Sequence, residues 1–176
     1  MLIVITGGSG SGKSEYAENL AMSLGKKRIY AATMMVYDEE GKTRVQRHRR
    51  MRESKDFCTL ECPVDLGSIT DGGLTEDAVV LLECMSNLVA NELFPAGSTI
   101  PEGNQIADKI LEGINAVIGH CRHLVVVTNE VFSDGKTYDR ETEYYIRTLG
   151  QVNVKLAVMA DRVVEVVCGL PVDYQQ

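Results

Sequence analysis

The sequence contains few of the residues that mark several large protein classes. It has no tryptophan, 6% aromatic residues and four prolines among its 176 residues. No run approaches the roughly 18 apolar residues that a transmembrane helix needs, so we expect no integral membrane segment. The apolar start, Met1 to Ile5, is too short for the apolar region of a secretory signal, and glycines follow it at once. These absences favour a cytoplasmic protein.

Positive charge and paired cysteines are also scarce. The formal net charge is −7 and the pI is about 5.0. Sequence-independent nucleic-acid binding needs a basic face, so we expect no nucleic-acid partner. The five cysteines are widely spaced, and Cys58 and Cys62 have no matching second pair, which argues against zinc. We therefore expect reduced and mostly buried thiols.

Short apolar runs alternate with amphipathic segments along the chain. Runs rich in Val, Ile and Leu without clean polar alternation are typical of strands covered on both faces. They are Leu2–Thr6, Arg28–Ala32, Ala78–Glu83, Leu124–Thr128 and Val163–Cys168. Helical spacing of apolar residues predicts helices at Ser14–Leu24, Cys84–Phe94, Asn104–Cys121 and Thr142–Met159. This alternation predicts a three-layer α/β/α fold with a mostly parallel central sheet, in a single catalytic domain, residues 1–176.

Residues 7–14 read Gly-Gly-Ser-Gly-Ser-Gly-Lys-Ser and fill every fixed position of the phosphate-binding motif G-x-x-x-x-G-K-[ST]. Glycines let the backbone wrap a phosphate closely, and the N–H groups at the following helix start attract anions. A ligand-free turn would not need Gly-Lys-Ser at the helix start, so we predict a P-loop NTPase fold. The predicted nucleotide contacts are Gly7, Gly8, Ser9, Gly10, Ser11, Gly12, Lys13 and Ser14.

Two kinds of residue should complete this site. Lys13 is expected to reach the β- and γ-phosphates catalytically, and Ser14 to bind Mg²⁺. A carboxylate at the end of a parallel strand faces the crevice where ligands bind, and Glu83 closes an apolar run. Glu83 is therefore the predicted second magnesium ligand, with Glu130 as the rival candidate.

A local basic cluster interrupts this acidic chain. Residues 44–52 contain five arginines and His48. Arginines suit phosphate oxygens, and a neutral imidazole can act as a nucleophile that carries a phosphoryl or nucleotidyl group. From the residues alone, a solvated basic helix and a nucleic-acid patch stay open as alternatives.

Together these stretches resemble the bifunctional adenosylcobinamide kinase / adenosylcobinamide-phosphate guanylyltransferase family of cobalamin assembly. The resemblance runs from Ile3 to about Gly169. It rests on Ile5–Ser14, Tyr30–Thr33, Arg44–His48, Leu81–Cys84, Val127–Val131, and Gly150 and Asn153 followed by Ala160-Asp161. The stretch Arg-x-Gln-x-His together with Thr-Asn-Glu is far more specific than the P-loop alone.

The resemblance implies two reactions at one active centre. A nucleoside triphosphate, ATP or GTP, phosphorylates the aminopropanol arm of adenosylcobinamide. A histidine, matched here by His48, then takes GMP from GTP and passes it to the cobinamide phosphate. The resemblance also implies a corrinoid substrate, Mg²⁺ and a homo-oligomer, with a trimer as one form. The further nucleotide contacts that it implies are Thr33, Met34, Met35, Arg49, Arg50, Met51, Arg52, Glu61 and Glu83.

The sequence departs from the family pattern at three places. The family usually has arginine at the position of Gly10 and often a second histidine at that of Arg47. After Thr-Asn-Glu-Val it usually continues with a Gly-x-Gly…Pro loop, where this chain has Phe132–Lys136. The changed loop bears on which corrinoid is accepted and on whether both activities are kept.

Two other functions stay open at this stage. A P-loop kinase for another small molecule, without guanylyl transfer, would leave His48 dispensable. A nucleotide-switched binding module would turn over slowly and would use Thr33 and the residues after it as a switch. The sequence does not decide between ATP and GTP as phosphate donor.

Overall fold

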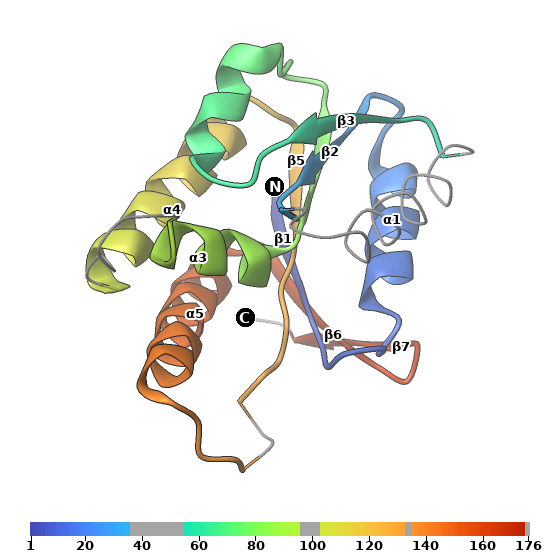
Figure 1. Cartoon of the computed structure of the whole chain (residues 1–176). Helices are drawn as coiled ribbons and strands as arrows, with labels where there is room; N and C mark the ends of the chain where they lie inside the picture. The colour runs from blue at the N-terminus through green and yellow to red at the C-terminus, as the bar shows by residue number, and fades with distance from the viewer. Residues whose placement is uncertain (36–54, 96–102, 133–134, 175–176) are drawn as a thin grey trace.

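The computed structural model describes residues 1–35, 55–95, 103–132 and 135–174. Within them, seven strands form one sheet in the order β3-β2-β4-β5-β1-β6-β7 (Figure 1). Their bounds are β1 Leu2–Thr6, β2 Arg28–Ala32, β3 Phe57–Glu61, β4 Val79–Glu83, β5 His123–Val127, β6 Arg162–Val167 and β7 Leu170–Tyr174. Across the sheet, each strand from β3 at one edge through β2, β4, β5 and β1 to β6 is parallel to its neighbour, and β7 runs antiparallel to β6.

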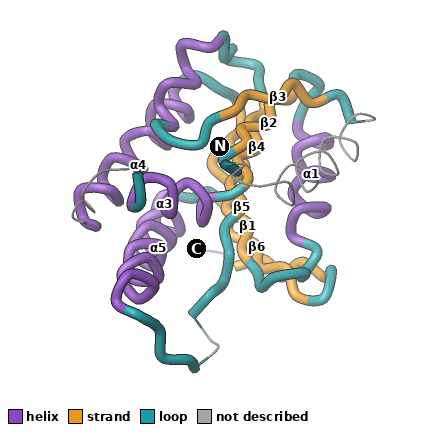
Figure 2. The backbone as a smooth tube through the Cα atoms, in the orientation of Figure 1, coloured by secondary structure: helices purple, strands orange, loops and turns teal. Residues whose placement is uncertain are grey.

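Helices cover both faces of the sheet, which confirms the predicted three-layer α/β/α fold. Helix α1, Lys13–Leu24, lies on one face (Figure 2). The other face carries α3 Met85–Leu93, α4 Gly103–Gly119 and α5 Arg140–Met159, and a 3₁₀ helix, η1 Leu66–Gly72, packs on α4. No helix in the described part of the chain combines the length and the apolar character needed to cross a membrane.

The hydrophobic core has two parts, one on each face of the sheet, and alternate side chains of each strand belong to opposite parts. In β1, Ile3 and Ile5 are buried with α1, whereas Leu2 and Val4 are buried on the face of the other helices. Successive side chains of a strand point to opposite faces, so a strand covered on both sides must be apolar throughout. This explains why the central strands were recognisable as continuous apolar runs.

The two edge strands were not predicted. Strand β3 is half-exposed, and its sequence Phe-Cys-Thr-Leu-Glu lacks a continuous apolar run. Strand β7 is exposed along its whole length and contains Pro171, which is tolerated at a sheet edge but weakens a strand prediction. Edge strands need less burial than central ones, so apolar content is a poor guide to them.

Several predicted details need correction. Helix α5 begins at Arg140 because the Asp139 carboxylate accepts hydrogen bonds from the N–H groups of Glu141 and Thr142. The expectation of mostly buried thiols is wrong for Cys58 and Cys168, which are exposed. All five cysteines are free. Burial raises the pKa of Cys62 and of Cys121 to about 11.

Helix α4 approaches η1 with backbone against backbone. A Cβ added to Gly113 would lie 3.1 Å from the amide nitrogen of Gly67 and 3.1 Å from the Cβ of Leu66. Gly150 in α5 has more room, because its added Cβ would meet the Phe132 ring at 3.4 Å, an ordinary contact distance. Alanine therefore needs a small backbone shift at Gly113 and fits without one at Gly150.

We expect Gly113→Ala and Gly150→Ala to change the free energy of unfolding in opposite directions. Alanine in a helix usually stabilises by about 0.5–1 kcal/mol relative to glycine, and Gly150→Ala should show this gain. Gly113→Ala should instead destabilise by about 1 kcal/mol, because the backbone of η1 must move. Urea unfolding of both variants measures the difference. An equal gain at the two positions would contradict the close contact between α4 and η1.

Candidate nucleotide-binding site

The loop between β1 and α1 is a tight backbone turn. Gly7, Gly10 and Gly12 have φ values of 155°, 72° and 90°, which residues other than glycine rarely adopt. The amide of Ser11 donates to the carbonyl of Gly8 at 3.2 Å. A Cβ added to Gly7 would lie 2.6 Å from the carbonyl oxygen of Val166 on β6. The loop thus follows a course that depends on its glycines.

Helix α1 starts with its amides free of a side-chain cap. Its N-cap is Gly12 in a left-handed conformation, which provides no side-chain hydrogen bond to the first turn. Ser14 lies half-buried in this turn. The first N–H groups and the helix dipole together attract an anion. The start of α1 can therefore receive an anion, and the nucleotide contacts predicted for residues 7–14 stay predictions.

Lys13 bends back over the loop. Its side chain is largely buried at 9% exposure, and its Nζ donates to the carbonyl of Gly8 at 3.0 Å. Burial lowers the pKa of Lys13, and the interactions of its ammonium with Cys84 and Glu83 oppose this shift. The cation thus lies over the loop and interacts with the end of β4.

The hairpin of β6 and β7 supports the loop from the side. The amide of Gly169, in the turn, donates to the carbonyl of Ser11 at 2.8 Å. A Cβ added to Gly12 would lie 3.2 Å from the Cα of Gly169, so the two backbones are in close contact. Farther along the hairpin, Arg162 forms a two-pronged ion pair with Asp173 at 2.6 and 2.8 Å. This support gave no local signal in the sequence.

The predicted carboxylates lie at the carboxyl edge of the sheet. Glu83 ends β4, next to Ala32 of β2 and Val127 of β5, and the Tyr30 hydroxyl donates to its Oε2 at 3.0 Å. Glu61 ends β3, farther from the P-loop strand. Glu130, the rival candidate, donates its amide to the carbonyl of Gly7 at 3.1 Å. Both Glu83 and Glu130 thus lie close to the P-loop region.

Thr33 ties β2 to the end of β4. It is fully buried, and its hydroxyl donates to the carbonyl of Cys84 at 2.8 Å and accepts from the Cys84 amide at 2.7 Å. Its own amide donates to the carbonyl of Glu83 at 3.1 Å. Met34 and Met35 follow, half-exposed. The nucleotide contacts predicted for these three residues stay predictions, and the Thr33 hydroxyl supports the strand ends.

A polar cluster centred on the buried Ser86 lies beside this edge and was missed from the sequence. The Ser86 hydroxyl accepts from the Asn129 amide at 2.6 Å, is hydrogen-bonded to the Cys84 thiol at 2.9 Å, and is hydrogen-bonded to Tyr145. Burial raises the pKa of Tyr145 to about 12, with Cys84 adding to the shift and the Ser86 bond opposing it. The cluster joins β4, β5 and α5. Only the Thr-Asn-Glu stretch gave a signal for it.

The predicted nucleophile His48 lies outside the described residues. The nucleotide contacts predicted beside it lie outside them as well, namely Arg49, Arg50, Met51 and Arg52. Within the described ranges, no group of three or more His, Cys, Asp or Glu side chains could hold a metal ion. Ser14 and Glu83 supply a hydroxyl and a carboxylate, which are the oxygen ligands that Mg²⁺ takes alongside phosphate and water.

Comparisons with known proteins agree with this geometry. The family described as cobinamide kinase / cobinamide phosphate guanyltransferase matches residues 3–174. The bifunctional adenosylcobalamin biosynthesis protein CobU of Salmonella typhimurium is 34% identical, with 98% of each chain covered. CobU of Escherichia coli is 32% identical over the same shares. CobP of Pseudomonas aeruginosa is 28% identical, covering 96% of this chain and 94% of its own.

Among solved structures, a KaiC-like protein from Pyrococcus horikoshii superimposes with a TM-score of 0.50 and 12% identity, covering 93% of this chain and 71% of that chain. This likeness concerns the fold alone. The family match extends over nearly the whole sequence and confirms the family resemblance described in the sequence analysis. The chain therefore belongs to the bifunctional cobinamide kinase / cobinamide phosphate guanylyltransferase family of cobalamin biosynthesis.

Proposed function

We propose that this chain performs both reactions of its family at one nucleotide site. It would phosphorylate cobinamide with ATP or GTP, and then transfer GMP from GTP to the cobinamide phosphate through His48. The observation that carries the proposal is the placement of Lys13. Its buried ammonium lies against the carbonyl of Gly8, at the uncapped start of α1, and interacts with Glu83.

The kinase step needs positioning and charge compensation more than covalent chemistry. In the proposed step, Lys13 exchanges the Gly8 carbonyl for phosphate oxygens, and the loop amides bind the same phosphates. The hydroxyl oxygen of cobinamide forms a bond to the γ-phosphorus as the bond to the β–γ bridging oxygen breaks. The hydroxyl proton is released to water.

The magnesium site that we propose consists of Ser14 and Glu83. Tyr30 supports this assignment because its hydroxyl donates to Glu83 and fixes the carboxylate at the strand end. A magnesium ion held there would compensate phosphate charge. Glu130 is the alternative carboxylate, because its amide is bound to the carbonyl of Gly7.

The guanylyl step is assigned to His48. The chain leaves β2 at Ala32, on the carboxyl edge where the P-loop and Glu83 also lie, and His48 follows in the sequence. A neutral ring nitrogen of His48 forms a bond to the α-phosphorus of GTP, and pyrophosphate leaves. A phosphate oxygen of the cobinamide phosphate then attacks the same phosphorus and frees the histidine. Arg49, Arg50 and Arg52 would compensate the phosphate charge.

Other features of the proposed enzyme come from the sequence. A single catalytic domain, residues 1–176, is supported by the continuous sheet that spans the described strands. The homo-oligomer, with a trimer as one form, and the cytoplasmic location stay predictions. A kinase without guanylyl transfer is the competing function, because the loop after Glu130 departs from the family pattern.

Incubation with GTP and Mg²⁺ should add one GMP to the wild-type protein, and this adduct should be acid-labile. His48→Ala should show no adduct, because no other group is proposed to accept the nucleotide. Intact-protein mass spectrometry measures both, and His120→Ala, at an exposed histidine, is the matched control and should form the adduct normally. An unmodified wild-type protein that still binds GTP would leave only the kinase half.

A glycine substitution in the loop should test whether phosphate binding depends on the backbone course of the loop. Gly7→Ala should weaken binding of a GTP analogue by about tenfold or more, because φ is 155° and its Cβ would overlap the Val166 carbonyl. Gly119→Ala, at the end of α4 and outside the site, is the control, since an added Cβ meets nothing within 4 Å. Fluorescence titration of both variants measures the affinities. Equal affinities would count against the proposed phosphate site.

A further inference from the structure

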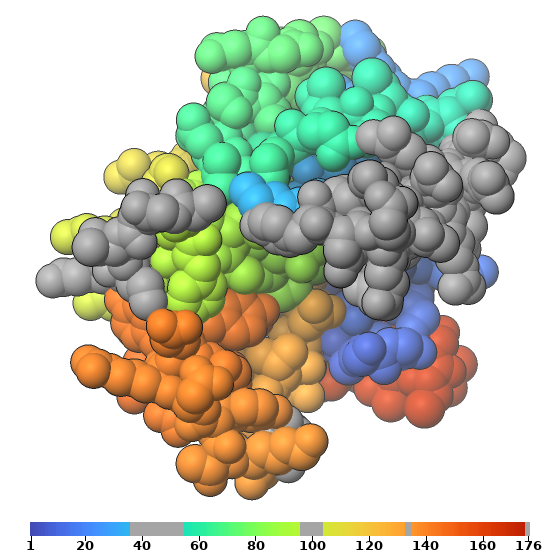
Figure 3. All heavy atoms as spheres, viewed as in Figure 1, coloured from blue at the N-terminus to red at the C-terminus, as the bar shows by residue number. Residues whose placement is uncertain are grey.

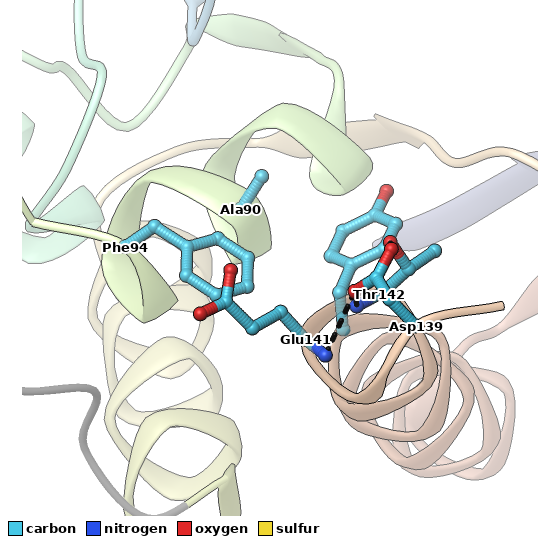
Figure 4. Close-up of a pocket in the computed structure, with 6 residues that line it drawn as sticks. Ala90, Phe94, Asp139, Glu141 and Thr142 are labelled. Carbon is cyan, nitrogen blue, oxygen red and sulfur yellow. Dashed lines mark hydrogen bonds between the residues drawn. The ribbon is translucent and has the colours of Figure 1, made fainter.

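A pocket of about 380 Å³ lies between α3 and α5, apart from the P-loop. Ala90 and Phe94 line it from the end of α3, and Asp139, Glu141, Thr142 and Tyr145 line it from the start of α5. Figure 4 shows Phe94 and Glu141 projecting into the space between the two helices. The Phe94 side chain is 37% exposed and contributes apolar surface to the pocket.

The lining of this pocket suits an uncharged ligand that donates hydrogen bonds. Phe94, Ala90 and the Tyr145 ring supply apolar surface, and the six lining residues include two acids and no cation. The Asp139 carboxylate is held by the amides of Glu141 and Thr142 at 3.0 and 2.9 Å, as the dashed lines of Figure 4 mark. Carboxylates accept from amide N–H groups and repel phosphate. The pocket is therefore unsuited to a nucleotide.

The polar cluster around Ser86 lies between the pocket and the phosphate site. Tyr145 lines the pocket and is hydrogen-bonded to Ser86, and Ser86 is bonded to Cys84. Cys84 and Glu83 both interact with the Lys13 ammonium. In Figure 3, α3 and the start of α5 meet beside the loop after β5, and the P-loop lies on the other side of that loop. The pocket and the phosphate loop are therefore on opposite sides of the same short loop.

A second hollow lies along α5 and has a different chemistry. Phe132, Lys136 and Arg147 are among its lining residues, and its volume is about 400 Å³. Its lining carries two cations and the acid Glu143, whereas the charged residues that line the first pocket are all acidic. It provides an alternative position for the acceptor, with an exposed phenylalanine of its own.

We propose that the pocket between α3 and α5 binds the amide-bearing, non-reacting part of the corrinoid acceptor and directs its hydroxyl arm towards Lys13. This rests on the proposed function, which makes a corrinoid the second substrate. Binding energy from the remote part of a substrate positions the reacting group, so the pocket contributes to the rate as well as to affinity. Phe94 packs on the apolar surface of the ligand, and Glu141 accepts from its amides.

Cobinamide binding to the full-length protein tests this assignment, followed by equilibrium dialysis and corrinoid absorbance. Phe94→Ala should weaken binding by roughly tenfold, because the apolar contact of one aromatic ring is removed. Glu141→Gln should weaken it by about threefold, since an amide is a poorer acceptor than a carboxylate. Phe132→Ala tests the second hollow and should stay within about twofold of wild type when the acceptor is held in the first. Val158→Ala, at an exposed position of α5 that lines neither hollow, is the neutral control. All variants should bind a GTP analogue normally.

Equal cobinamide affinities for wild type and Phe94→Ala would overturn the assignment, as would a loss confined to Phe132→Ala. A wild-type protein that does not bind cobinamide would overturn it too. Turnover is measured separately. If wild type binds cobinamide but makes neither the phosphate nor the GDP product, the proposed function fails, and the binding comparison still decides the role of the pocket.

Discussion

Parallel pairing of the strands brings the carboxyl ends of β1, β2, β4 and β5 to one edge of the sheet. Every group of the candidate site depends on this register. The P-loop leaves β1 there, Thr33 leaves β2, Glu83 ends β4, and the Thr-Asn-Glu stretch follows β5. Because β5 separates β1 from β4, the groups of the site are spread across several neighbouring strands.

Electrostatics divides this edge into two parts. On the P-loop side, an uncapped helix start and the Lys13 ammonium favour anions. On the side of α3 and α5, Asp139 and Glu141 face a partly aromatic pocket and disfavour them. The polar cluster around Ser86 lies between the two parts. A chain that binds a nucleotide and a bulky second substrate benefits from keeping their binding surfaces distinct.

Local patterns in the sequence predicted the central strands, the helices and the phosphate loop. Strands such as Val79–Glu83 are apolar throughout because both faces are buried, and the loop motif fixes its residues position by position. The edge strands could not be predicted, because exposed strands lack the continuous apolar run of a buried one. The strand order could not be predicted either, because it depends on pairing between segments that are far apart in the sequence. The Ser86 cluster was missed for the same reason. Tyr145 and Ser86 are far apart in the sequence, and only the packing of α5 on α3 brings them together.

The contact between the β6–β7 turn and the P-loop joins segments that are far apart in the sequence. Gly169 donates to Ser11, and the backbone at Gly12 lies against the same turn. During synthesis the loop is translated well before the hairpin that supports it. The nascent loop therefore lacks this support until β6 and β7 have been made, so it gains its full set of backbone contacts only after the central strands have been translated.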